Sequence, residues 1–485
     1  MTAVHSVAQV RRAEHATGDL LTNGTLMQRA AYALAVACVD LLETPAVPGS
    51  RVVLLVGSGG NGGDALWAGA LLAARGCRVD AVTFGGPIHP EGAAALTRAG
   101  GRLHVKLNAE LIHDADIVID GIAGIGGNGP IRDPHLTSLL RATGATVVSV
   151  DVPSGVNADT GWADPDAVVP ADLTVTFGSL KPGLLVAPGR DFSGVVQLVE
   201  IGLECDEAPV AEVIDALGIA MALPMPTEDA YKYSRGVAGI VAGSTTYRGA
   251  ALLATGAAAR CNLGMVQFFD RGDGNAEAVV HAVPDIVTTT QIDTNSRVNA
   301  WGIGPGLGED VSLLLSLLAT EVPIVLDADA LRMCADASVQ AALADRASRG
   351  RVTVMTPHVG EFAALGFEVG EDRLAAAKAA ASELGVVMVL KGAGTIIAAP
   401  SGRAFIDVEG TEVLGTAGSG DVLTGIVTSF LAANQPTTLD DAARIVAAAV
   451  AVHGIAGSCA EVASGTVNSV DIMDAIGAAF ASVLS

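Results

Sequence analysis

The amino-acid sequence predicts an α/β protein with two domains and parallel sheets. Three observations lead to this expectation. The chain has 485 residues, which is too long for one ordinary core and suits two domains of roughly 200 to 260 residues. Half of the residues are apolar and only 16% are charged. Short aliphatic runs alternate with helical patterns throughout, which is typical of βαβ units.

The first domain is expected to be doubly wound. The run RVVLLVG reads as a buried strand, and the stretch DALWAGALLAARG, which ends at Gly76, reads as the helix after it. Strands are expected at 51–57, 77–85, 116–121 and 146–155, and helices at 24–43 and 64–76. The last two strands each end in an acid followed by a glycine-bearing loop.

The alternation pauses between about 203 and 236, where acids and prolines replace the strand pattern. We place the boundary near residue 224, which gives domains 1–224 and 225–485. The alternation then resumes. Strands are expected at 236–244, 263–269, 297–304, 322–330, 351–358 and 386–394, and helices at 248–261, after Gly420, around 439–461 and near 470–483.

Composition excludes several classes of partner. A formal net charge of −24 leaves no basic stripe for nucleic acid. The apolar run 445–457 is too short to span a bilayer, so we expect a buried helix and no membrane contact. The N-terminal stretch has no apolar h-region, and the six cysteines are scattered without a CxxC pair. We therefore expect a cytoplasmic protein with reduced thiols.

The stretch GSGGNGGD at 57–64 follows the first strand and fits the dinucleotide pattern GxGxxG. An ordinary nicotinamide dehydrogenase is therefore one alternative. Asp80 argues against it, since this acid sits inside its strand pattern rather than at the strand end. Asp64 also argues against it, because in the first helical turn it would repel a pyrophosphate.

Two further loops, DGIAGIGGNGP (120–130) and DVPSGVNADTG (151–161), should reach the same carboxyl edge of the sheet. The three loops together supply oxygen-bearing side chains that suit a cation or a proton transfer: Asn61, Asp64, Asp120, Asp151 and Ser154. Each aspartate taken alone could equally be a helix cap or a turn residue. Together, at three strand ends, they predict a site.

These three loops resemble the NAD(P)H-hydrate epimerase domain over essentially all of residues 1–220. The resemblance implies that the loop around Asn61 to Asp64 holds the substrate phosphates, and that Asp151 contacts the substrate and is the catalytic proton-transfer acid. It implies a potassium ion on Asn61, Asp120 and Ser154. The implied substrate-binding residues are Gly60, Asn61, Gly62, Gly63, Asp64, Gly124, Ile125, Gly126, Gly127, Asn128, Gly129, Pro130 and Asp151. The family loop usually reads NNGGD, and Gly60 replaces its first Asn here.

A second glycine cluster, GTAGSGD at 415–421, feeds an apolar helix. Such a turn collects amide donors at the positive end of a helix dipole and can stabilise a transferring phosphoryl group. Asp421 cannot bind the phosphate, because like charges repel, but it can take the proton from the attacking hydroxyl. No Walker sequence occurs, so the chain is not a P-loop enzyme.

Other segments of this half also fit a nucleotide site. GPGLG (304–308) is a strand-to-helix turn, DADAL (327–331) puts two acids at a strand end, and Lys391 opens KGAGT (391–395). His358 lies one turn before Glu361 in TPHVGEF. Taken singly, His358 could be a helix cap and Lys391 a surface lysine.

These motifs resemble the ribokinase-like, ADP-dependent NAD(P)H-hydrate dehydratase across about 226–485. By that resemblance, the residues that contact the hydrated dinucleotide are Ala250, Gly306, His358 and Asp421. The AMP portion of the nucleotide would lie on Lys391, Gly392, Ala393, Gly394, Thr395 and Gly420. Tyr231-Lys232-Tyr233 stands where the family usually has His-Lys-Gly, and nothing is carried over from that element.

The sequence therefore predicts a bifunctional enzyme that epimerises NADHX and NADPHX and dehydrates the S hydrate, releasing AMP and phosphate. Expected cofactors are K⁺ in the first site and Mg²⁺ with ADP or ATP in the second. We also expect a homo-oligomer. Two alternatives stay open: a ribokinase-like vitamin or sugar kinase joined to a dinucleotide-binding domain, and an N-terminal domain that only binds or scaffolds.

Overall fold

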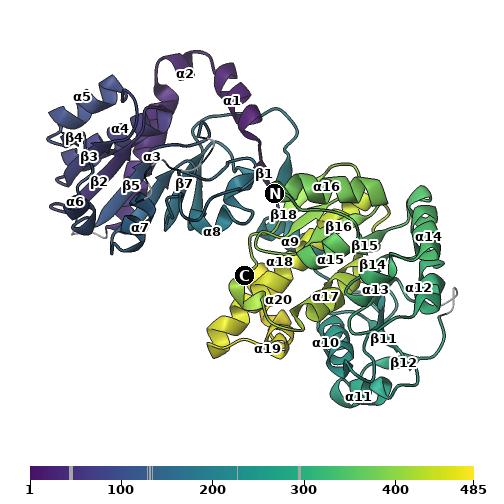
Figure 1. Cartoon of the computed structure of the whole chain (residues 1–485). Helices are drawn as coiled ribbons and strands as arrows, with labels where there is room; N and C mark the ends of the chain where they lie inside the picture. The colour runs from purple at the N-terminus through teal and green to yellow at the C-terminus, as the bar shows by residue number, and fades with distance from the viewer. Residues whose placement is uncertain are drawn as a thin grey trace. The chain divides into compact units, whose positions relative to one another are not determined.

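The computed structural model describes residues 1–42, 47–127, 129, 131, 133, 135–226, 228–292 and 297–485. The chain divides into two compact units, one of Ala3–Val210 and one of Met1–Thr2 with Ala211–Ser485. The strand β1 (Thr2–Val4) lies at the N-terminal border of this division. The division after Val210 precedes the expected boundary near residue 224. Each unit is an α/β fold with helices around a sheet (Figure 1).

The N-terminal unit is built on a seven-stranded sheet in the order β4-β3-β2-β5-β6-β7-β8, and its neighbouring strands pair in parallel. The strands are β2 (Arg51–Val56), β3 (Arg78–Thr83), β4 (Arg102–His104), β5 (Ile117–Gly121), β6 (Thr146–Val150), β7 (Leu173–Phe177) and β8 (Val195–Val199). The strand order reverses between β2 and β5. Doubly wound sheets bind ligands at such a switch point, at the carboxyl ends of the strands.

Helices cover both faces of this sheet, as the alternation within β2 requires. Val52 and Leu54 join one apolar cluster, while Val53 and Leu55 join the opposite one. The helical segments are α1 (Val7–Ala16), α2 (Asp19–Thr22), α3 (Thr25–Leu41), α4 (Gly60–Ala74), α5 (Pro90–Arg98), α6 (Ala109–His113), α7 (Leu136–Arg141), η1 (Pro182–Leu184) and α8 (Arg190–Ser193).

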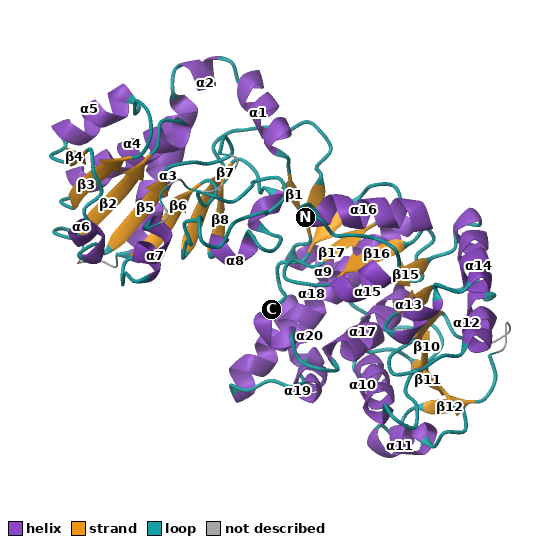
Figure 2. Ribbon diagram, viewed as in Figure 1, coloured by secondary structure: helices purple, strands orange, loops and turns teal. Residues whose placement is uncertain are grey.

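The C-terminal unit holds a longer sheet whose order from β9 is β9-β18-β17-β16-β15-β14-β13-β10-β11-β12. Pairing is parallel except for β16 with β17 and β17 with β18 (Figure 2). The strands are β9 (Ala211–Val213), β10 (Val237–Val241), β11 (Met265–Phe269), β12 (Val287–Thr289), β13 (Ala300–Ile303), β14 (Ile324–Leu326), β15 (Thr353–Met355), β16 (Val387–Leu390), β17 (Ile396–Ala398) and β18 (Ala404–Ile406).

The helical segments of this unit lie on both sides of its sheet (Figure 2). They are α9 (Ala216–Ala222), α10 (Arg248–Ala259), α11 (Asn275–Ala282), α12 (Val311–Leu318), α13 (Asp329–Met333), α14 (Ala337–Ser348), α15 (Val359–Ala364), α16 (Arg373–Leu384), η2 (Glu412–Leu414), α17 (Ser419–Asn434), α18 (Leu439–Ser464), α19 (Ser469–Asp474) and α20 (Ile476–Leu484).

Close packing of α17 fixes the position of its N-terminus. A Cβ on Gly425 would come within 2.2 Å of the Ala254 carbonyl oxygen of α10, so the two helix backbones touch. On its other side α17 packs against α18. By length and composition α18 passes as a membrane span among the described helices, yet 72% of its most apolar window is buried inside the unit. The buried helix expected at 445–457 is confirmed.

Three expectations need correction. The segment 203–236 was expected to lack strand structure, but β9 pairs with β18, and α9 follows it. The helix expected near 470–483 is two helices, α19 and α20, which meet at Ala475. The strand expected at 386–394 ends at Leu390, because the chain turns back there into the antiparallel strand β17.

Candidate functional site

The first candidate site lies at the carboxyl ends of β2, β5 and β6, where a glycine-rich loop leaves the sheet. A Cβ on Gly57 would come within 1.9 Å of the Ile122 carbonyl oxygen, and one on Gly62 within 2.1 Å of the Gly57 carbonyl oxygen. Both positions therefore require glycine. Gly59 and Gly60 have nothing within 4 Å of such a Cβ and line a cavity of about 450 Å³. The loop is thus closely packed at Gly57 and Gly62, whereas Gly59 and Gly60 line the cavity.

The helix α4 begins at this opening. It starts at Gly60, four residues before the expected start, and takes Asn61, Gly62 and Gly63 into its first turn. Asp64 therefore lies in the second turn, not in the first as expected. Glycines are poor helix formers, so the sequence pattern alone places the start too late. The free amides and dipole at this N-terminus favour an anion such as a phosphate.

Asn61 connects the start of α4 to two other loops. Its Nδ2 donates a hydrogen bond of 2.5 Å to the carbonyl oxygen of Val150, the last residue of β6. The same side chain lies against Gly124, where an added Cβ would come within 2.1 Å of Nδ2. Among the residues that the structure describes, the Asn61 Oδ1 has no hydrogen-bond partner.

Asp120 and Ser154 are buried and touch each other. The Ser154 Oγ lies 2.6 Å from Asp120 Oδ1, and the Ser154 amide donates to Asp120 Oδ2 at 2.8 Å. Burial raises the pKa of Asp120, against the hydrogen bonds that lower it. The Ser154 hydroxyl also lies 3.1 Å from the Ala123 carbonyl oxygen. If the Ser154 hydroxyl donates to this carbonyl, one of its lone pairs and Asp120 Oδ1 become free to bind a cation. These oxygens therefore fit a cation site.

The loop that follows β5 lies against the Asn61 side chain at Gly124. Its described glycine turn closes through a 2.8 Å bond from the Gly127 amide to the Gly124 carbonyl oxygen. Arg11 of α1 donates to the Ile125 carbonyl oxygen at 3.3 Å and approaches Gly126. Gly129 has a φ of 128°, which favours glycine. Asn128 and Pro130, also predicted for this loop, lie outside the described residues.

Asp151 directly follows β6 and adopts an unusual backbone conformation, with a φ of 66°. Non-glycine residues in this region carry strain and cluster at functional sites. Its Oδ1 accepts hydrogen bonds from Thr176 Oγ1 at 3.0 Å, from the Phe177 amide at 3.4 Å, and from Lys181 Nζ at 2.5 Å. The sequence reasoning missed Lys181. Its place in SLKPG after a strand, and the presence of only five lysines in the chain, are the available signals.

Two further carboxyl groups lie near Asp151. Asp64 is buried, and its Oδ1 has no hydrogen-bond partner among the described atoms. Burial, together with the charges of Asp151 and Glu14, raises the pKa of Asp64 well above its usual value. Burial and Asp151 likewise raise the pKa of Glu14 of α1, which sequence reasoning also missed. A protonated Asp64 would not repel a phosphate, which removes the conflict noted from the sequence.

The second candidate site lies at the N-terminus of α17. Gly418, with a φ of 87°, caps the helix, and Asp421 lies in its first turn. A Cβ on Gly420 would lie 3.5 Å from Lys391 Nζ and 3.7 Å from Asp327 Oδ2, so these groups meet at the helix start. Burial and then the charge of Asp327 raise the pKa of Asp421 to about 6, while Lys391 opposes the shift.

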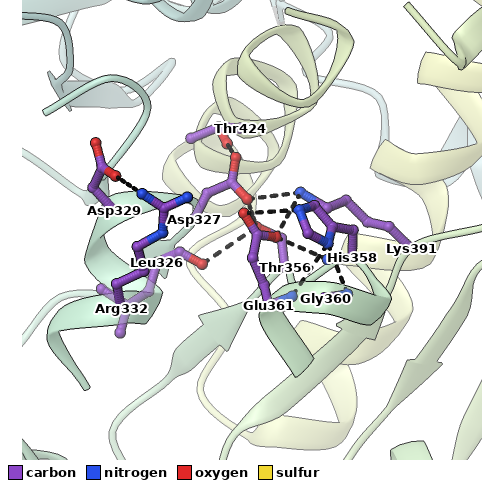
Figure 3. A network of polar contacts seen from close by, with 10 residues as sticks. All are labelled: Leu326, Asp327, Asp329, Arg332, Thr356, His358, Gly360, Glu361, Lys391 and Thr424. Carbon is purple, nitrogen blue, oxygen red and sulfur yellow. Dashed lines mark hydrogen bonds and ion pairs between the residues drawn. The ribbon is translucent and has the colours of Figure 1, made fainter. Parts of the chain in front are cut away.

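Asp327, at the end of β14, is the centre of a buried network (Figure 3). Its Oδ1 accepts from Lys391 Nζ at 2.8 Å and from Thr356 Oγ1 at 2.9 Å, and its Oδ2 accepts from Thr424 Oγ1 at 2.9 Å. Burial lowers the pKa of Lys391, but Asp327 and the nearby carboxylates outweigh burial, so this pKa is raised. Lys391 is thus not a simple surface lysine.

His358 caps the N-terminus of α15. Its Nδ1 accepts from the Gly360 amide at 2.9 Å and from the Glu361 amide at 3.2 Å, and the Glu361 carboxylate accepts from the His358 amide (Figure 3). The capping interpretation is therefore correct, but it does not exclude a ligand contact. The side chain is 60% exposed, and its Nε2 faces away from the helix amides.

The remaining predicted residues form two groups. Gly306, with a φ of 57°, lies against Ala250 in the first turn of α10, since an added Cβ would be 3.0 Å from the Ala250 Cβ. Lys391, Gly392, Ala393, Gly394 and Thr395 form the turn between β16 and β17, closed by a 2.9 Å bond from Thr395 Oγ1 to the Gly392 carbonyl oxygen. Arg373 of α16, unforeseen from the sequence, donates to the Lys391 carbonyl oxygen at 3.2 Å.

Two family models match the chain, in the order of the two units. The model described as YjeF-related protein N-terminus matches residues 23–183, and the model described as NAD(P)H-hydrate dehydratase matches residues 238–477. The first match contains the loops around Asn61, Asp120 and Asp151, and the second contains Lys391 and Asp421.

Curated relatives match both units at once. A protein of Mycobacterium tuberculosis named Bifunctional NAD(P)H-hydrate repair enzyme Nnr is 41% identical over 446 residues, which cover 90% of each chain. One of the same name from Corynebacterium glutamicum is 33% identical and covers 95% of this chain and 94% of the relative. A solved ADP/ATP-dependent NAD(P)H-hydrate dehydratase from Bacillus subtilis, co-crystallized with ATP/Mg²⁺, is 27% identical. It covers 56% of this chain and 99% of that one, at a TM-score of 0.46.

Proposed function

The chain belongs to the bifunctional NAD(P)H-hydrate repair enzymes, and from that premise we propose that each of its two units carries one of the two activities. The chain repairs hydrated NADH and NADPH. It interconverts the R and S hydrates at C6 and dehydrates the S hydrate to NAD(P)H at the expense of ADP, releasing AMP and phosphate. The match to a bifunctional relative over 90% of both chains is the observation that carries this conclusion.

We assign dehydration to residues 225–485, with Asp421 as the base. Its carboxylate takes the proton of the C6 hydroxyl as that oxygen bonds to the β-phosphorus of ADP, and the bond from this phosphorus to its bridging oxygen breaks to release AMP. The amides that start α17 face the charge on the transferring group. Phosphate then leaves C6, assisted by the ring nitrogen lone pair, and loss of a C5 proton restores the double bond.

The other dehydratase residues are assigned to binding. Ala250, Gly306 and His358 would contact the hydrated dinucleotide, and the turn 391–395 with Gly420 would hold the AMP portion. The meeting of Gly420 with Lys391 in one place supports this assignment. Charge on the phosphates needs neutralisation, which we assign to Mg²⁺ that accompanies ADP or ATP.

We assign epimerisation to residues 1–224. The cavity lined by Gly59, Gly60 and residues 87–90 would admit the substrate phosphates onto the amides of α4. Asp151 would take the proton of the C6 hydroxyl as the bond from C6 to the ring nitrogen opens, and return it when the ring closes on the opposite face of C6. The contact between Asp120 and Ser154, and the free Oδ1 of Asn61, support a potassium ion there. One carboxylate and two neutral oxygens suit a large monovalent ion better than magnesium.

The test is an assay with mixed hydrate epimers and ADP that follows the return of reduced-nicotinamide absorbance. The wild type should consume both epimers, the Asp151→Asn variant only the S epimer at an enzymatic rate, and the Asp421→Asn variant neither. A stable phosphorylated product without reduced nicotinamide would instead support the small-molecule kinase alternative. The cytoplasmic location and the homo-oligomeric state remain predictions, to be measured by cell fractionation and by light scattering.

A further inference from the structure

Lys181 is a buried cation that the proposed reaction leaves without a role. It lies at the N-cap of η1, four residues after the end of β7, and its side chain is 0% exposed. An ammonium group taken out of water is unfavourable unless it is paired and fully hydrogen-bonded. The three hydrogens of Nζ meet this demand: they point to Asp151 Oδ1 at 2.5 Å, Thr176 Oγ1 at 2.9 Å and the Phe177 carbonyl oxygen at 3.0 Å.

The two carboxylate oxygens of Asp151 differ in their hydrogen-bond partners. Oδ1 accepts from Lys181, from Thr176 and, more weakly, from the Phe177 amide. Among the residues that the structure describes, Oδ2 has no hydrogen-bond partner. One oxygen is thus clamped against β7 while the other is left for a ligand. The positive φ of Asp151 is the backbone conformation that accompanies this arrangement.

A purely structural salt bridge is a weak explanation. Replacing a buried ion pair by apolar residues is often neutral or stabilising, so stability alone does not require it. The strained backbone of Asp151 adds a further cost, and such strain gathers at functional positions. The pair also lies at the strand end that the proposed epimerase site uses.

The surrounding charges give Lys181 a second effect. Glu14 and Asp64 also lie within electrostatic reach of Asp151, and the three acids would repel one another if all were ionised. Lys181 contacts Asp151 directly and acts on Glu14 only at a distance. Its positive charge is therefore closest to Asp151.

We propose that Lys181 is a positioning residue for epimerisation, which holds Oδ1 of Asp151 in place and leaves Oδ2 to take and return the proton of the C6 hydroxyl. This inference rests on the proposed epimerase function of the N-terminal unit. It assigns no substrate contact to Lys181, which acts only through Asp151.

The test compares Lys181→Met with Lys106→Met, an exposed lysine of the same unit, in the full chain. Each protein is assayed for conversion of the R into the S hydrate, and dehydration of the S hydrate in the same chain reports an intact C-terminal unit. We expect Lys181→Met to lower the kcat of epimerisation by about 100-fold, the usual cost of misplacing a catalytic group, with little change in KM. Lys106→Met should behave as the wild type.

The pH profile separates positioning from a structural role. Loss of the positive charge beside the proton-transfer group should move the acidic limb of the epimerisation profile to higher pH. Besides Lys181, the ionisable groups that bear on this profile are Glu14 from α1 and Asp64 from α4, while Cys205 faces Lys181. A loss of folded protein would lower the rate at every pH without moving the limb.

Thr176→Val provides a second variant that keeps the ion pair. It removes one donor to Oδ1 and one acceptor of Lys181, so we expect about a tenfold lower kcat, the effect of roughly one hydrogen bond. If Lys181→Met does not fold, this variant decides. If the variant that folds has the wild-type kcat and its acidic limb lies at the wild-type pH, the inference about Lys181 is overturned while the proposed function stands. A wild type that fails to interconvert the epimers would overturn the proposed function as well.

Discussion

The two sites share a motif and use it differently. In each, a buried aspartate at a strand end pairs with a lysine that follows another strand of the same sheet: Asp151 with Lys181, and Asp327 with Lys391. In the N-terminal unit the paired aspartate is itself the proposed proton-transfer group. In the C-terminal unit the pair stands beside the proposed base, Asp421, whose pKa is about 6.

This difference matches the two tasks. A reversible epimerisation returns its proton, so a carboxylate held firmly in one place by a cation serves in both directions. Phosphoryl transfer needs a base that ionises near neutral pH, and a direct contact with Lys391 would make Asp421 too weak a base. Asp421 therefore lies near Lys391 rather than in direct contact with it. Four predictions test this contrast.

The largest effect is expected for Asp421→Asn. Removing the base while keeping the shape should cost roughly 10²- to 10⁴-fold in dehydration, the usual worth of a general base. Nucleotide binding should change little, and epimerisation in the same chain should be unaffected. The assay is the return of reduced nicotinamide from pure S hydrate and ADP. Near-normal turnover would show that Asp421 is not the base, and the contrast between the two sites would then not hold.

Asp120→Ala should act only on the other site. Loss of this carboxylate should weaken the binding of the potassium ion. Because the ion supports the substrate, substrate affinity should fall by about 10- to 100-fold, the range seen when a metal site loses its supporting residues. Dehydration of the S hydrate is the internal control. Wild-type epimerisation should be faster in potassium than in sodium or magnesium buffers. Equal rates in all three, or ion–oxygen distances near 2.1 Å in a crystal structure, would indicate another kind of site.

The pH dependence of dehydration should follow Asp421. The base must be ionised, so kcat should fall about tenfold per pH unit below 6 and level off above it. Lys391 lowers the pKa of Asp421, so the Lys391→Met variant should move the limb to higher pH. Lys378→Met, which replaces a half-buried lysine of the same unit, is the matched control. A limb that stays in place would mean that Lys391 does not set the charge state of the base.

The smallest effect concerns stability at the first site. The folded state raises the pKa of Asp64, so it holds this proton more tightly than the unfolded chain. The resulting stabilisation is full below the unfolded pKa and is lost as pH rises to the folded pKa. Asp64→Asn should lack this decline and be more stable than the wild type by about 1 kcal/mol at the alkaline end. Urea unfolding at several pH values measures it, with exposed Asp166→Asn as the control.

Patterns local in sequence predicted much of this arrangement. Strand-end acids after aliphatic runs led to Asp120 and Asp151, and a glycine turn before an apolar helix led to Asp421. These features depend on neighbouring residues only, so the sequence displays them directly. The alternation of strands and helices likewise predicted the α/β class of both units.

Contacts between distant segments could not be predicted in this way. Lys181 is 30 residues from Asp151, and Thr424 is 97 residues from Asp327. Only the strand order of the folded sheet brings such pairs together, and no periodicity records it. The start of α4 was misplaced for a related reason: its glycines disfavour a helix locally, while the close approach of Gly62 to the Gly57 backbone admits nothing larger there.

The backbone contact between α10 and α17 has a consequence for redesigning the substrate range. Gly425 lets α17 lie directly on Ala254, and one turn earlier α10 presents Ala250 to Gly306. A larger residue at Gly425 would push α17 outward and carry Asp421 with it, which would trade catalysis for space. Enlarging Ala250 would narrow the space beside Gly306 while leaving the base in place. To adapt the enzyme to other hydrated cofactors, residues in the first turn of α10 should therefore be varied. The contact between α10 and α17 should be kept.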